Sequence, residues 1–205
     1  AFASIQQWPW QRQAYAIAID RVMEAGAKAV AVDLILDRPS VWGPDDDDFL
    51  QYALERYPGR IVLASSFDDS ANDSGLTLQL VTPRPQFLQA GGTPGIINYP
   101  FESNERIHRF AQVWLQRQAE QDGVVQSFFN SLPDSFTQTF VEQAITAAQL
   151  GPEAPEDLES LRGDQIFFYG PKGTFQYESF WTVLDPQNWQ VHLRQNTFRD
   201  KIVLI

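Results

Sequence analysis

Hydrophobic positions in the first third of the chain follow a helical period and then become continuous. From about Trp10 to Ala25, apolar residues recur every three or four positions, as on the buried face of a helix. Ala29 to Leu36 is almost wholly apolar, which is typical of a strand covered on both faces. A second helical pattern, Phe49 to Tyr57, leads to another apolar run, Ile61 to Phe67. These segments predict a βαβ unit over residues 29–67 with parallel strands and a right-handed crossover.

The rest of the chain is less regular but still indicates several elements. Residues 68–75 are polar and favour a loop. The other predicted elements are strands at Thr77–Val81, Gly95–Tyr99, Arg106–Gln116 (half-exposed and antiparallel), Ile166–Tyr169 and Ile202–Ile205, and helices at Ser135–Leu150 and Ser179–Leu184. Together they predict a single α/β domain over residues 1–205. Its central sheet is mostly parallel with helices on both faces (three layers), and its irregular middle section can hold one antiparallel strand.

Composition narrows the classes of partner. The chain has 15 Lys and Arg against 26 Asp and Glu, a formal net charge of −11. Phosphate backbones need clustered basic residues, so this balance argues against nucleic acid and against docking on an anionic membrane surface. There is no cysteine, which excludes disulfides, thiolate metal sites and a cysteine nucleophile.

No apolar run approaches the roughly 20 residues that span a bilayer, and no signal peptide heads the chain. The last residues, Lys201 to Ile205, have the pattern of a buried strand that is broken off without a terminator. We therefore expect an excised part of a longer membrane protein, tethered through segments outside this chain.

Polar residues at the predicted strand ends are the candidate ligand contacts. The carboxyl ends of parallel strands meet at one edge of the sheet, where open α/β sheets bind ligands. The residues expected to border one cavity there are Asp33, Ser65, Ser66, Asn98 and Tyr169, with Arg106 and Arg109 folding back from the next turn. Asp33 would favour an amine or hydroxyl partner over a carboxylate, a preference that Arg106 and Arg109 would reverse if they fold back, or it would instead cap loop amides as a structural group. The ligand itself is an unknown small molecule.

The remaining motifs favour structural roles. Asp45 to Asp48 are consecutive, whereas calcium loops alternate their ligands, so helix-terminal and solvated charge explains them better than a cation site. His108 and His192 lack metal-ligand spacing, and Gly170 to Thr174 lacks the phosphate-loop spacing. We expect no catalytic residue, metal or cofactor, and hence not an enzyme. The competing interpretation is a Rossmann-like enzyme that uses Asp33 with a histidine.

Several blocks resemble one family. They are Trp8-Pro-Trp-x-Arg12, Gly26-Ala-Lys-x-Val-x-x-Asp33, Gly95-Ile-Ile-Asn98, Tyr169-Gly-Pro-x-Gly-Thr-Phe175 and Lys201-Ile-Val-Leu-Ile205. In this order they are similar to the CHASE2 domain, an extracytoplasmic sensor module of bacterial, notably cyanobacterial, signalling proteins. The chain departs from the family by having Asn104-Glu105 where Asp-Gly is usual, and by lacking a further strand ahead of residues 3–5.

The resemblance implies a role in signalling. Family members usually follow one transmembrane helix, precede several others and feed a cytoplasmic output domain. We expect a periplasmic domain that binds a small molecule and passes a conformational signal onward, with a homodimer as one arrangement. The alternative is a dimerisation or protein-docking module without a small ligand.

Overall fold

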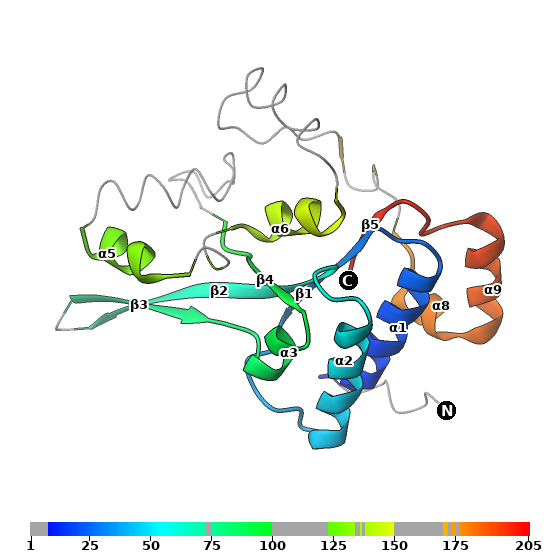
Figure 1. The fold of residues 1–205 in the computed structure, drawn as a ribbon, viewed down its shortest axis with the longest axis horizontal. Coiled ribbons are helices and arrows are strands. Elements are labelled where there is room, and N and C mark those ends of the chain that lie inside the picture. Colours follow the sequence, from blue (N-terminus) through cyan, green and yellow to red (C-terminus); the bar gives the residue numbers. More distant parts are fainter. Residues whose placement is uncertain are drawn as a thin grey trace.

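The computed structural model describes residues 8–72, 75–99, 123–133, 136, 138–149, 170–171, 174 and 177–205. Within this part of the chain, a five-stranded sheet separates two layers of helices (Figure 1). The strands are β1 (Ala29–Ile35), β2 (Ile61–Asn72), β3 (Gly75–Val81), β4 (Thr93–Ile96) and β5 (Ile202–Leu204).

The sheet is mostly parallel. β2 pairs with β1 and β4, and β1 pairs with β5, all in parallel, which gives the order β4-β2-β1-β5. The far half of β2 pairs instead with β3 as an antiparallel hairpin that projects beyond the helices (Figure 1). The predicted α/β class is therefore confirmed, as is the parallel βαβ unit over residues 29–67.

Helices cover both faces of the sheet. The larger core cluster lies under α1 (Arg12–Glu24), α2 (Pro44–Arg56), α3 (Pro85–Gln89), α8 (Phe180–Leu184) and α9 (Pro186–Gln195). The smaller cluster forms where α6 (Phe140–Ala147) packs on alanines and valines of β1 and β2. The helix α5 (Gly123–Ser131) lies beside the β2–β3 hairpin (Figure 1). Alternation along β1 explains the division, since Val30 and Val32 face α1 while Ala29 and Ala31 face α6.

Three sequence expectations need correction. Residues 68–72 continue β2 instead of forming a loop, because each of them pairs with β3. The helix predicted at 135–150 is shorter, because α6 covers Phe140–Ala147 and a capping box between Thr139 and Glu142 starts it. The helices α3, α5 and α9 were not predicted, since they are short and α3 and α9 begin at prolines within polar sequence.

Two further predicted strands, Arg106–Gln116 and Ile166–Tyr169, lie outside the described residues.

Candidate functional site

The carboxyl ends of β1, β2 and β4 meet at one edge of the sheet. Asp33 lies near the end of β1, Ser65 and Ser66 lie in β2, and Asn98 follows β4. The parallel pairing therefore brings these predicted residues to the same edge. The other three predicted contacts, Arg106, Arg109 and Tyr169, lie outside the described residues.

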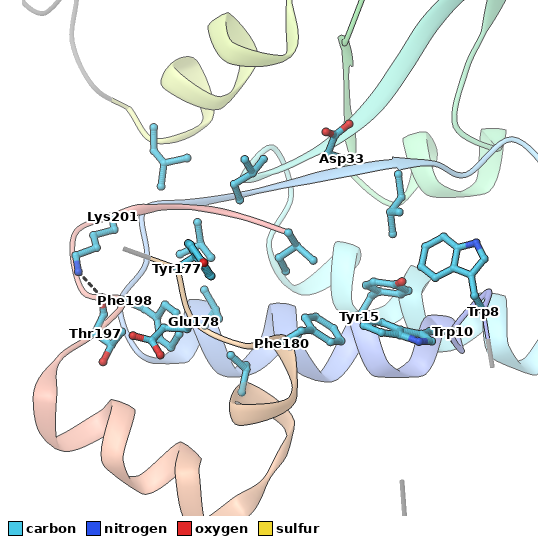
Figure 2. Close-up of a pocket in the computed structure, with 18 residues that line it drawn as sticks. Trp8, Trp10, Tyr15, Asp33, Tyr177, Glu178, Phe180, Thr197, Phe198 and Lys201 are labelled. Atoms are coloured by element: carbon cyan, nitrogen blue, oxygen red, sulfur yellow. Dashed lines mark hydrogen bonds between the residues drawn. The ribbon is translucent and has the colours of Figure 1, made fainter. Parts of the chain in front are cut away.

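Asp33 is the exposed charged group of this edge. Its carboxylate makes no hydrogen bond or ion pair to the residues that the structure describes, although its backbone N–H donates to Ile205. Figure 2 shows the carboxylate directed to the opposite side of β1 from Tyr15 and Phe180, the side on which α6 packs. Asp33 therefore caps no loop amide within the described chain.

Tyr99 is the neighbour of Asp33 that sequence reasoning missed. Burial raises the pKa of the half-exposed Tyr99 phenol, and the negative charge of Asp33 raises it further. The fold accounts for this charge effect, because the ends of β1 and β4 lie on either side of β2 at the same edge of the sheet. A carboxylate beside a protonated phenol can accept a hydrogen bond from an ammonium or hydroxyl group, and the phenol can donate or accept one.

Asn98 has a structural task at this edge. Its carboxamide oxygen accepts from the backbone N–H of Phe67 at 2.7 Å, and its nitrogen donates to the Phe67 carbonyl at 2.9 Å. The side chain thus continues the β2–β4 ladder by one step after β4 has ended. Gly95 is needed for a different reason, since a Cβ there would lie 2.7 Å from the Cα of Phe140 in α6.

The two serines differ in accessibility. Ser65 is completely buried, and its hydroxyl has no partner within the described part of the chain. It cannot touch a ligand at the surface without a rearrangement of the sheet. Ser66 is half-buried and, by alternation with Ala64, lies on the α6 side with Asp33.

A buried cluster of ion pairs lies at the carboxyl edge of the sheet, on the side of β1 that α1 and α2 cover. Asp47 forms ion pairs with Arg12 and Arg84, and its side chain is only 3% exposed. Asp46 accepts from the backbone N–H groups of Arg12 and Gln13 at 2.8 and 3.0 Å and so caps α1, which has no cap of its own.

This cluster corrects two sequence interpretations. The aspartate run lies at the start of α2 as predicted, and Asp45 and Asp48 are exposed, but Asp46 and Asp47 are buried and paired instead of solvated. Arg12 is the second case, since a charged residue of a surface helix is expected in solvent, yet it is 8% exposed because α2 packs over it. Burial, and then the positive charge of Arg84, lower the pKa of Arg12. No sequence signal marked Arg84, which sits between two prolines.

A groove with a volume of about 850 Å³ runs along β5 on the α1 side. Figure 2 shows an aromatic end, where Trp10 stacks on Tyr15 and on Phe180 with ring centroids 6.2 and 5.2 Å away, and a polar end at Thr197 and Lys201. Backbone and side chains of β5 form one wall. Asp33 also lines this groove, although Figure 2 shows its carboxylate directed to the other side of β1.

His192 is a structural histidine within the described fold. Its Nε2 lies 3.0 Å from the Thr182 hydroxyl, which itself donates to the Ser179 carbonyl, so Nε2 carries the hydrogen. Its Nδ1 lies 3.3 Å from the Thr197 hydroxyl. Both ring nitrogens therefore contact threonines and not Asp33. The other histidine, His108, lies outside the described residues.

The described part of the chain contains no group of three or more His, Asp or Glu placed to hold a metal ion. None of its helices is both long and apolar enough to cross a membrane.

Comparison with known proteins gives one clear result. A family model for the CHASE2 domain matches residues 2–205, essentially the whole chain. Comparison with curated proteins and with solved structures finds no significant match. The order of sequence blocks that suggested this family is thus supported by the full-length match. The chain belongs to the CHASE2 family, whose members are extracytoplasmic sensor domains of signalling proteins.

Proposed function

We propose that this domain senses a small molecule carrying an ammonium or hydroxyl group, bound at the carboxyl edge of the sheet by Asp33. The observation that carries the proposal is the exposed Asp33 carboxylate, which has no partner among the described residues and lies close enough to Tyr99 to raise the pKa of that phenol. An open α/β sheet binds its ligands at this edge.

The surroundings of Asp33 support a signalling role. On one side of β1, the Asp47 ion pairs and the Asp46 cap hold the starts of α1 and α2 together. On the other side, Asp33 and Tyr99 belong to different strand ends. A ligand that contacts both would favour one spacing of the β1 and β4 ends, and the preferred conformation would shift by the difference in affinity. That shift is the signal passed to segments attached to the domain.

We also propose that the domain is not a catalyst. The described acid and base candidates do not meet, since His192 contacts the hydroxyls of Thr182 and Thr197 while the Asp33 carboxylate has no partner among the described residues. A general acid–base pair needs hydrogen-bond reach between its members and the substrate.

The test is a thermal-shift screen with small amines, amino alcohols, polyols and, for contrast, carboxylates against the chain and two variants. Asp33→Asn removes the proposed contact, and Asp37→Asn makes the same change at another exposed aspartate beyond the end of β1. A ligand at 100 times its Kd should stabilise the protein by about 2.7 kcal/mol.

For a domain of this size, that stabilisation is a rise in Tm of roughly 5–11 °C. We expect the rise in the wild type and in Asp37→Asn, and its loss in Asp33→Asn. Binding that is equally strong in Asp33→Asn would show that the site lies elsewhere. Binding confined to carboxylates would contradict the proposed ligand class.

A further inference from the structure

The polar end of the groove along β5 carries two opposite charges that do not neutralise each other. Lys201 and Glu178 both line the groove and lie at this end in Figure 2, and no ion pair joins these two described side chains. The Lys201 ammonium donates to the Thr197 carbonyl at 2.6 Å, which holds it in place and leaves further N–H groups for a ligand. Glu178 is exposed and makes no hydrogen bond or ion pair with the described residues. This end therefore offers one cation and one carboxylate to a bound molecule.

The aromatic end of the groove contains a buried hydroxyl without a described partner. Tyr15 lines the groove and is only 5% exposed, yet its phenol makes no hydrogen bond to the residues that the structure describes. Figure 2 shows this phenol on the sheet side of α1, beside Trp8 and Trp10. Burial raises the pKa of the phenol to about 12, so it stays protonated at neutral pH and can donate or accept a hydrogen bond. Because buried polar groups are normally bonded, the phenol indicates a ligand atom at this end.

Between these two ends the groove is mainly apolar. Tyr15, Ala18 and Val22 line it from one face of α1, and residues of β5 line it from the sheet. The rise of an α-helix places Tyr15 and Val22 about 10 Å apart along α1. The volume of about 850 Å³ lies within the range of small-molecule sites. The groove therefore fits a molecule about 10 Å long that is apolar in its middle.

We propose that this groove binds a free amino acid with an aromatic side chain. The carboxylate of the amino acid pairs with Lys201, its ammonium group pairs with Glu178, and its ring lies along β5 with the far end at Tyr15. The two charges of the polar end match the two charges of an amino-acid head group, whereas a simple amine or a simple carboxylate uses only one of them. This site does not depend on a ligand at the Asp33 carboxylate, which is directed to the other side of β1.

The Tyr15 phenol distinguishes between aromatic side chains. The hydroxyl of a bound tyrosine or the indole N–H of a bound tryptophan can bond to it, whereas the ring of a bound phenylalanine leaves it without a partner. A site with a buried hydrogen-bonding group disfavours a ligand that lacks the matching group. We therefore expect tryptophan and tyrosine to bind more tightly than phenylalanine, by roughly fivefold to tenfold.

Titration calorimetry of the full chain tests the two charge contacts with tryptophan, with tryptamine, which lacks the carboxylate, and with indolepropionate, which lacks the ammonium group. The variants are Lys201→Gln and Glu178→Gln, with Glu55→Gln as the matched control, because Glu55 is exposed on α2 and is not among the residues that line the groove. Lys201 and Glu178 are also exposed, so these substitutions should change the Tm of the ligand-free protein by no more than about 2 °C.

Each variant should weaken only the ligands that carry the matching charge. Lys201→Gln should reduce the affinity for tryptophan and indolepropionate and leave that for tryptamine unchanged. Glu178→Gln should reduce the affinity for tryptophan and tryptamine and leave that for indolepropionate unchanged. Glu55→Gln should bind all three as the wild type does. Tryptophan affinity that is the same in all three variants and the wild type, or no binding of any aromatic amino acid to the wild type at millimolar concentration, would overturn the proposal.

Tyr15→Phe tests the aromatic end, with Tyr52→Phe as the control at a tyrosine that is 61% exposed on α2. Tyr15→Phe should abolish the preference for tryptophan over phenylalanine, and Tyr52→Phe should retain it. A preference that survives in Tyr15→Phe would show that the ring does not reach this phenol and would contradict the proposed orientation.

Two other outcomes separate this site from its alternatives. Loss of tryptophan binding in Asp33→Asn, with Lys201→Gln and Glu178→Gln unaffected, would place the amino acid at the carboxyl edge and overturn the groove assignment while supporting the function proposed above. Binding of decanoate, a simple apolar carboxylate, without binding of any amino acid would assign the groove to a lipid chain and also overturn it.

Discussion

The sharpest test of the fold is Asp47→Asn, which removes one charge from the buried ion cluster and keeps the shape of the side chain. The Asp47 carboxylate pairs with Arg12 and Arg84 and also accepts from the backbone N–H of Ser40 at 3.2 Å. The amide can retain part of this bonding, but it cannot neutralise two guanidinium groups. The variant therefore measures the effect of the negative charge of Asp47 on stability.

The expected loss of unfolding free energy follows from the burial of the arginines that pair with Asp47. Breaking a buried ion pair costs about 3–5 kcal/mol, because the remaining charge stays in the protein without its partner. Arg12 meets this condition, with a side chain 10% exposed, whereas the 24% exposed Arg84 can turn toward water. Arg12 also keeps its bond to the Arg38 carbonyl. We therefore expect the lower end, about 3 kcal/mol of lost unfolding free energy, or roughly 6–12 °C in Tm.

Urea and thermal unfolding of Asp47→Asn and Asp48→Asn measure this. Asp48 is the exposed neighbour in the same helix, so the same substitution there should change stability by no more than about 0.5 kcal/mol. If the two variants unfold at the same urea concentration, the buried cluster contributes nothing and the reasoning is refuted. A change in the slope of unfolding free energy against urea concentration would instead indicate an altered unfolded or native ensemble.

Four further outcomes are expected. Burial raises the pKa of Tyr15 to about 12. Its neutral form therefore stabilises the fold fully below about pH 10, and that contribution is lost as pH rises through 12. In Tyr15→Phe, the unfolding free energy should fall less as the pH is raised through this range. Asp33→Asn should lower the pKa of Tyr99 in an NMR titration, and an unchanged pKa would show that the two groups do not interact. Asn98→Ala should cost about 1–3 kcal/mol by removing two ladder hydrogen bonds, measured by urea unfolding. Ser65→Ala should be neutral or stabilising by about 1 kcal/mol, since the buried hydroxyl has no described partner; marked destabilisation would reveal one.

The sequence predicted the elements whose burial is continuous or strictly periodic. Residues 29–35 and 61–67 are apolar on both faces, and that pattern alone implies a parallel pair covered by helices. The extension of β2 over 68–72 was missed because its residues are polar. Pairing with β3 holds them in the strand, and pairing across a hairpin leaves no trace in the composition of one strand.

The sequence predicted only those parts of the candidate site that the order and direction of the strands determine. Parallel strands bring Asp33, Ser65 and Asn98 to one edge, and no further information is needed for that. The sequence does not show that Asn98 bonds to Phe67 or that Ser65 is enclosed, because both depend on neighbours more than 30 residues away or in other layers. Arg12 is the clearest case. As an arginine it is expected on the polar face of its helix, but contact with α2 buries it.

Two carboxylates of this edge differ in what a ligand could gain from them. Asp47 already has two guanidinium partners, so a ligand would have to displace a buried ion pair whose loss costs about 3–5 kcal/mol. Asp33 is exposed and has no described partner, so a ligand displaces only water. The proposed ligand would therefore bind most favourably on the α6 side of β1, while the Asp47 ion pairs on the other side keep the strand end in place. A ligand that acts through Asp33 can move Tyr99 and the β4 end without breaking the Asp47 cluster.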